Sequence, residues 1–166
     1  MGNPRGVKRN FDALLEHGRL AARRRCGSRA SRAGGIAGLT LWNFYFQIFE
    51  NTIGSEQVIE FLTHLLRHIP GKLLLVWDRL PAHRSRLTQQ FIRAQRGRLV
   101  TEFLPPYAPE LNPVEYLWAH CKHHELPNVC AKNLWDLTEG ARRTLKRMRR
   151  RPRLIVAFWK QACLFE

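Results

Sequence analysis

The stretch LLLVWDRLPAHRS, residues 73–85, carries the pattern that decides the fold. Its five large apolar residues, Leu73 to Trp77, form a run that is typical of a strand buried on both faces. Asp78 follows this run directly. A carboxylate at the end of a buried strand needs a cation, a proton or hydrogen-bond donors, because burying it unpaired is costly. The stretch therefore predicts a central strand of an α/β domain with an acidic residue at its end.

A second informative stretch is LPPYAPELNPVEYLW, residues 104–118. Asn112 can cap a helix whose first turn accommodates Pro113, so Glu115 falls near the positive N-terminal end of that helix. A strand-end Asp and a helix-start Glu in one small domain can converge on a hard divalent metal ion. The alternative is an Asp78 satisfied by backbone N–H groups and a Glu115 that only marks a helix start.

Taken with their surroundings, both stretches resemble motifs of the DDE transposases of the mariner-like superfamily. WDRLPAHRS is similar to the motif of the second aspartate, in which a His follows the strand-end Asp. LPPYAPELNPVEYLWAHCK is similar to the motif of the third acid, in which a Pro-Pro-Tyr loop runs into Asn-Pro-x-Glu. The resemblance extends from about Ala30 to Phe158 and is best for the branch carried by bacterial insertion sequences.

The resemblance implies a ribonuclease H-like fold, an acidic catalytic triad that binds two Mg²⁺ or Mn²⁺ ions, and cutting and joining of DNA at transposon ends. It assigns Asp78 and Glu115 as catalytic and metal-binding residues. His83 is an accessory candidate that could touch the scissile phosphate or orient a metal-bound water, or could be hydrogen-bonded within its own loop. Asn112 is a second accessory candidate, although its position favours a capping role.

One part of the family pattern is missing from the sequence. The family carries its first catalytic Asp on the opening strand of the domain, whereas the only Asp before Asp78 is Asp12, in NFDALLEHGRL. The apolar spacing of Phe11, Leu14 and Leu15 is helix-like, so we do not expect Asp12 to be the first acid. We expect an N-terminally truncated α/β domain: a ribonuclease H-like mixed sheet, flanked by helices, that lacks its first central strand.

A chain without the first acid should be impaired as an enzyme, because two carboxylates hold metal ions less well than three. The resemblance then predicts a transposase catalytic-domain fragment that is inactive on its own. The main alternative is a non-catalytic DNA-binding remnant that associates with a full-length transposase. A degenerate reading frame without a cellular role is a third interpretation.

The composition agrees with DNA as a partner. Lys and Arg number 28 against 13 Asp and Glu, a formal charge of +15, and such a chain attracts phosphate backbones in a salt-dependent way. One basic cluster spans residues 19–32. The other supplies the candidate DNA-binding residues, unless it is only a solvated charged face. These candidates are Arg142, Arg143, Lys146, Arg147, Arg149, Arg150, Arg151 and Arg153.

The sequence is organised as a basic segment, residues 1–32, that is partly helical or disordered, followed by a partial ribonuclease H-like domain, residues 33–166. The expected partners are DNA and either a second copy of the chain or a full-length transposase. No apolar run is long enough to cross a bilayer, so we expect a cytoplasmic, nucleoid-associated bacterial protein without a membrane partner.

The local patterns also predict the individual elements. A short helical signal covers residues 11–24, and Ser55 and Pro152 are expected to cap one helix and to break another. The expected strands are residues 36–41, 43–49, 73–77 and 99–103, and the expected helices are residues 56–68, 84–95, 133–150 and 154–163, with one more beginning near residue 113.

Overall fold

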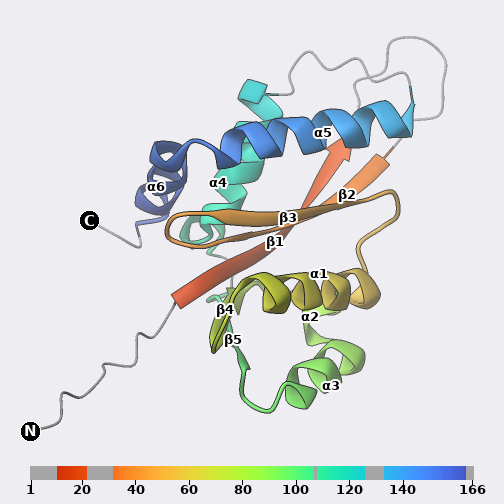
Figure 1. Cartoon of the computed structure of the whole chain (residues 1–166), viewed down its shortest axis with the longest axis vertical. Helices are drawn as coiled ribbons and strands as arrows, with labels where there is room; N and C mark the ends of the chain where they lie inside the picture. Colours follow the sequence, from red (N-terminus) through yellow and green to blue (C-terminus); the bar gives the residue numbers. More distant parts are fainter. Residues whose placement is uncertain (1–10, 22–31, 107, 126–132, 164–166) are drawn as a thin grey trace, which may run out of the picture.

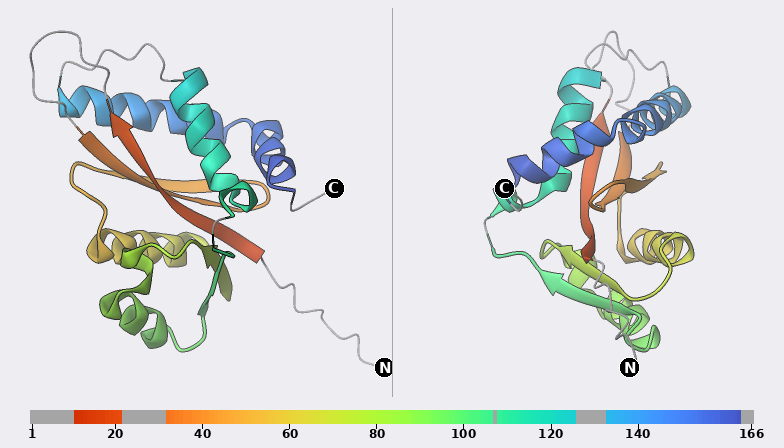
Figure 2. Two further views of the ribbon diagram at one scale, coloured as in Figure 1. Left: turned by 180° about the vertical axis from the view of Figure 1, so that it is seen from behind. Right: turned by 60° about the vertical axis from the view of Figure 1, so that its left-hand side comes forward.

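The computed structural model describes residues 11–21, 32–106, 108–125 and 133–163, with residues 11–21 described by their backbone. A five-stranded mixed sheet in the order β3-β2-β1-β4-β5 forms the centre, and helices cover both of its faces (Figures 1 and 2). The strands are β1 (Phe11–Ala21), β2 (Arg32–Leu39), β3 (Phe44–Phe49), β4 (Leu73–Trp77) and β5 (Leu99–Phe103).

The helices are distributed between the two faces. Helix α1 packs against α2 and α3 on one side, whereas α4 and α5 lie on the other side and both contact α6 (Figure 1). The helices are α1 (Ser55–His68), α2 (Pro81–Arg84), α3 (Arg86–Ala94), the 3₁₀ turn η1 (Pro109–Leu111), α4 (Pro113–His120) with its π-helical extension η2 (Cys121–Glu125), α5 (Leu134–Arg149) and α6 (Pro152–Gln161).

Strand β1 overturns the expectation that the first central strand is lacking. It pairs antiparallel with β2, with Gly18 opposite Gly35, and parallel with β4, with Leu15 opposite Trp77. The helix predicted from residue 11 onward is therefore wrong, while residues 22–31 lie outside the described part of the chain. The physical reason is that β1 supplies hydrogen-bond partners to both neighbouring strands, and this tertiary pairing outweighs the helical preference of its Ala, Leu and Glu residues.

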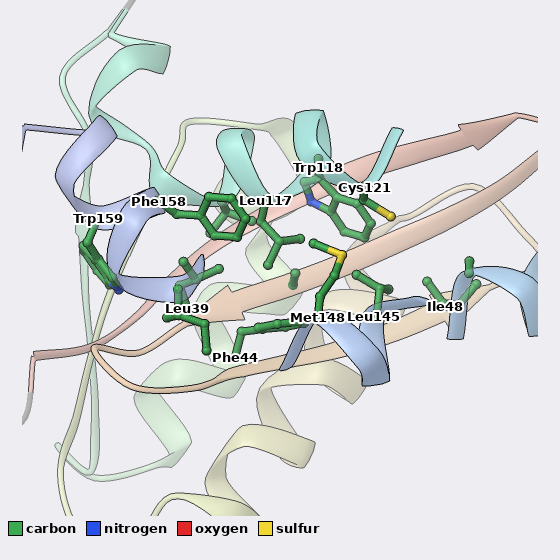
Figure 3. Packing of buried hydrophobic residues seen from close by; sticks show 14 of the residues in the cluster. Leu39, Phe44, Ile48, Leu117, Trp118, Cys121, Leu145, Met148, Phe158 and Trp159 are labelled. Atoms are coloured by element: carbon green, nitrogen blue, oxygen red, sulfur yellow. The ribbon is translucent and has the colours of Figure 1, made fainter. Parts of the chain in front are cut away.

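The alternation of side chains along the strands builds two separate cores. On β2, Leu39 belongs to the core beneath α4, α5 and α6, whereas Ile36 belongs to the core against α1. On β4, Leu75 and Trp77 join the α1 core. Figure 3 shows the first core, where side chains from α4, α5 and α6 meet those of the β2–β3 hairpin. Both faces of the sheet are thus covered, as the apolar run at residues 73–77 predicts.

Helix α4 lies very close to the sheet because β2 has a glycine beneath it. A Cβ atom on Gly35 would approach the Trp118 ring to 2.6 Å. Trp118 is 1% exposed and belongs to the core beneath α4, α5 and α6. The absence of a side chain at Gly35 therefore sets the height of α4 above the sheet, and with it the position of Glu115.

Most predicted elements are confirmed, with small differences at their ends. The strands at 73–77 and 99–103 match β4 and β5. Helix α1 is capped by Gly54, whose N–H donates to the Gln57 side chain, and Ser55 is its first residue rather than its cap. The helix predicted at 84–95 is confirmed as α3, which begins at Arg86 because Ser85 adopts an extended backbone and caps it through Thr88; Arg84 instead ends the short helix α2. No helix in the described part of the chain is long and apolar enough to span a membrane.

Candidate functional site

Asp78 occupies the end of β4, immediately after the buried Trp77. Its Oδ1 atom accepts a hydrogen bond from the Leu80 N–H at 3.1 Å and lies 2.7 Å from Nδ1 of His83. The side chain of Asp78 is 30% exposed, so one part of the residue is fixed by the protein while another faces solvent. The turn after β4 thus holds a carboxylate at the surface in a defined orientation.

His83 is fixed between Asp78 and the α1 core. Its ring is fully buried and stacks on the Trp77 ring, with centroids 4.3 Å apart and an angle of 10° between the planes. Its Nδ1 atom also lies 3.1 Å from the carbonyl oxygen of Asp78. A ring buried in this way is placed to orient Asp78, which favours the loop-bonded interpretation of His83 over contact with a phosphate.

Glu115 is positioned by the start of α4. Asn112 caps the helix as predicted: its Oδ1 atom accepts a hydrogen bond from the Val114 N–H at 3.1 Å, and its side chain is buried. The N–H of Glu115 donates to the carbonyl oxygen of Asn112 at 3.0 Å. Pro113 fixes φ in the first turn. Glu115 is therefore a partly exposed carboxylate at the positive end of a helix.

A single pocket brings the two acidic residues together. Its volume is about 380 Å³, and both Asp78 and Glu115 line it, together with Arg79 and Asn112. The loop before α4, including Pro105, closes another side. Two carboxylates with hard oxygen atoms around one pocket are the donor set that Mg²⁺ and Mn²⁺ prefer. Arg79 was not singled out from the sequence, although its place directly after Asp78 was the available signal.

The pairing of β1 with β4 runs to the last residue of β4, directly before Asp78. Leu14 is opposite Val76 and Leu15 is opposite Trp77. Glu16 follows Leu15 on β1 as Asp78 follows Trp77, so the two acidic residues come one position after the last paired residues of the neighbouring strands. Asp12 instead lies at the register shift between Phe11 and Ala13, further back along β1. Glu16 is not recognisable from the sequence as a counterpart of the first acid, because it is a Glu in a segment with a helix-like apolar pattern.

The basic residues of α5 lie on its solvent-exposed side, while residues such as Leu145 and Met148 pack into the core (Figure 3). Together with Arg150 and Arg151, which directly follow the helix, they form two stripes in which the basic residues are four positions apart. We call these the paired stripe and the open stripe. In the paired stripe, Arg143 contacts Glu139 at 3.2 Å, and Arg147 and Arg151 both donate to Glu125. The open stripe consists of Arg142, Lys146 and Arg150, and no ion pair involves it within the described residues. Of the remaining candidates, Arg149 lies 6.0 Å above the Phe46 ring and Arg153 is exposed in α6.

Glu125, which the sequence did not mark as important, closes the far end of α4. Its side chain is 8% exposed, and Arg151 reaches its Oε1 atom at 2.9 Å. The hydrogen bond from Arg147 is the main cause that lowers the pKa of Glu125 below its ordinary value. Burial and the neighbouring His124 lower the pKa of His120, and burial raises the pKa of the adjacent Cys121 thiol to about 12. The contacts of Glu125 with Arg147 and Arg151 join η2 to α5 and the residues after it, which indicates a structural role.

Comparison with known proteins agrees with this geometry. A family model described as DDE superfamily endonuclease matches residues 12–138, a range that begins on β1 and includes both motifs. A search of curated proteins found no match to the sequence.

Solved structures show the same fold. The catalytic domain of Mos1 mariner transposase superposes with a TM-score of 0.69 at 13% identity, covering 93% of this chain and 76% of that one. A Mos1 catalytic domain with raltegravir and Mg gives a TM-score of 0.64 at 16% identity, with coverages of 94% and 79%.

A match to a longer Mos1 chain shows how much of a transposase this chain spans. The Mos1 transposase in a paired-end complex with the left transposon end gives a TM-score of 0.67 at 14% identity, covering 96% of this chain. It covers 53% of that chain, so the present protein spans about half the length of the transposase in that complex.

Proposed function

Because this chain belongs to the DDE superfamily endonucleases, we propose that it is a transposase catalytic domain that cleaves and joins DNA strands at transposon ends. The observation that carries the proposal is the single pocket lined by Asp78 and Glu115, at the end of β4 and the start of α4. The fold shared with the Mos1 catalytic domain supports it.

In this proposal the two carboxylates hold divalent metal ions, Mg²⁺ or Mn²⁺, in a two-ion site. The Mos1 catalytic domain has been solved with each of these metals, and the oxygen-rich pocket of this chain suits the same ions. When bound, such ions supply Lewis-acid activation of a nucleophilic oxygen and stabilise the charge of the leaving oxygen. Asp78 and Glu115 fix where the ions sit, and His83 and Asn112 position those two residues.

The register of β1 suggests how the triad is completed. Glu16 and Asp78 each come one residue after the paired Leu15 and Trp77, and we propose that Glu16 has the role of the first Asp of the family. A Glu in this place supplies the same charge on a side chain one methylene longer, so we expect metal binding with altered geometry. Under this assignment the chain has three acidic residues at the site instead of the two expected from the sequence, and substitution of Glu16 tests it.

DNA binding in this proposal relies on the exposed basic side of α5 and on Arg153. Each phosphate that these side chains neutralise releases condensed counterions, which gives affinity without sequence preference. The remaining partners are transposon-end and target DNA, together with a second copy of the chain or a longer transposase.

Plasmid nicking tests the proposal. The purified chain should nick supercoiled DNA with Mg²⁺ or Mn²⁺ and not with chelator, and Asp78→Ala, Glu115→Gln and Glu16→Gln should each suppress nicking and weaken Mn²⁺ binding measured by calorimetry. Glu102→Gln is a matched control, because Glu102 is an exposed acid on neighbouring β5 that does not line the pocket. DNA binding without metal-dependent nicking, and with Mn²⁺ binding unaffected by the three substitutions, would instead favour the non-catalytic DNA-binding remnant.

A further inference from the structure

Arg79 is the one positively charged side chain that lines the pocket with Asp78 and Glu115 among the described residues. It directly follows Asp78 and is exposed. Its guanidinium carbon lies 5.4 Å from the centroid of the Phe103 ring, within the range of a cation–π contact. Phe103 ends β5 and is opposite Trp77 in the sheet, so Arg79 reaches sideways from Asp78 over the end of the neighbouring strand.

The other contacts in the pocket argue that Arg79 is not there to neutralise the acidic residues. The Oδ1 atom of Asp78 lies 2.7 Å from Nδ1 of His83 and accepts a further hydrogen bond from the Leu80 N–H. Within the described part of the chain no ion pair joins Arg79 to a carboxylate. The Phe103 ring thus supports the guanidinium at the pocket, and no hydrogen bond within the described residues occupies its five N–H donors.

We propose that Arg79 binds a backbone phosphate of the DNA strand that enters this pocket, and so fixes the path of that strand from the start of α4 across Asp78 to the end of β5. A guanidinium is suited to this role because its planar fork can donate two parallel hydrogen bonds to phosphate oxygens, and the aromatic face beneath it limits the orientations it must lose on binding. Arg79 is therefore a substrate-positioning residue that sets which phosphate lies next to the metal-binding acids. The inference rests on the proposed function.

Binding of oligonucleotides that carry one methylphosphonate, an uncharged phosphate analogue, tests this contact. Affinity for each oligonucleotide is measured with Ca²⁺ as the divalent ion for the wild-type chain, Arg79→Gln and Arg79→Lys. The loss of affinity at each substituted position gives a methylphosphonate profile for each protein. We expect one position to weaken wild-type binding about tenfold, the equivalent of about 1.4 kcal/mol. In Arg79→Gln that position should no longer matter, because the charge it contacts is gone, while Arg79→Lys should keep part of the effect.

Arg93→Gln is the matched control, since Arg93 is an exposed arginine on α3 away from the pocket, and it should leave the whole profile unchanged. A wild-type profile without a sensitive position, or a sensitive position that persists in Arg79→Gln, would overturn the proposal. Tighter Mn²⁺ binding by Arg79→Gln with an unchanged DNA profile would also overturn it, by showing that Arg79 only balances the acids.

The variants Asp78→Ala and Glu115→Gln separate this inference from the proposed function. If both retain metal-dependent nicking, the proposed function fails whatever Arg79 does. If both lose it while Arg79→Gln keeps the wild-type methylphosphonate profile, only the role of Arg79 fails.

Discussion

The two ends of α4 and its extension carry acidic residues in contrasting surroundings. At the N-terminal end, Glu115 is partly exposed and shares a pocket with Asp78. At the far end, Glu125 is almost completely buried and receives hydrogen bonds from Arg147 and Arg151. One helical segment thus holds one carboxylate toward solvent and encloses another among cations of the chain itself.

This difference indicates which carboxylate is available for chemistry. The guanidinium groups around Glu125 satisfy its charge and lower its pKa, so it fastens η2 to α5 and has little left to offer a ligand. In the pocket, Asp78 is held by a buried imidazole and a backbone N–H, contacts that orient the carboxylate and leave part of it exposed. In the proposed function a metal ion neutralises the pocket of Asp78 and Glu115, whereas the arginines of the chain already neutralise Glu125.

The largest expected effect is on metal-dependent cleavage. Asp78→Ala or Glu115→Gln should reduce it by more than about a hundredfold, because each removes an oxygen ligand from the proposed metal site. Glu125→Gln removes a carboxylate from the other end of the same helical segment and should leave cleavage within about threefold. Rates of plasmid nicking measure the effects of these substitutions. Equal losses of rate from Glu115→Gln and Glu125→Gln would contradict the distinction between the two carboxylates.

The next effect concerns the two stripes on α5. Replacing Arg142, Lys146 and Arg150 with Ala should flatten the slope of log affinity against log salt by up to about three units, because this open stripe is available to phosphates. Replacing Arg143, Arg147 and Arg151 should change the slope less, because carboxylates already take up their charge. Salt titrations of DNA binding distinguish the stripes, and a larger change from the paired stripe would contradict the assignment.

A smaller effect is expected where α4 rests on the sheet. Gly35→Ala places a methyl group against Trp118 and should lower the free energy of unfolding by about 1–3 kcal/mol. Urea denaturation gives this value. The double variant Gly35→Ala/Trp118→Phe should lose less than the two single changes together, because the smaller ring relieves the overlap; strict additivity would show that the close contact is not the cause.

The smallest effect is expected at the enclosed carboxylate. Glu125→Gln should lower the free energy of unfolding by about 1 kcal/mol at pH 7, since it removes ion pairs whose arginines are exposed. The lowered pKa of Glu125 means that its contribution is present above the pKa of an unfolded Glu, about 4.3, and is lost as pH falls through the lower folded value. Denaturation of the wild type and Glu125→Gln from pH 7 down to pH 3 should show the difference between their free energies of unfolding becoming smaller. A difference that persists at pH 3 would argue against ion pairing.

The sequence by itself determined those parts whose signal is local. The apolar run at 73–77 is sufficient to define β4 because a strand buried on both faces needs no alternation, and Asn112 with Pro113 defines the start of α4 because capping involves adjacent residues. Asp78 and Glu115 can therefore be proposed from local sequence alone; the structure places both at one pocket, and their role in metal binding stays a prediction.

Only the tertiary structure decided what lies between these elements. The segment containing Leu14, Leu15 and Glu16 has a helical pattern, and it becomes the central strand because β2 and β4 offer hydrogen bonds along both of its edges. The same holds for Glu125 and the two arginines that enclose it, which are more than twenty residues away along the chain. Pairing of strands and ion pairs between distant segments depends on where the chain returns in space, and local patterns of residues do not contain that information.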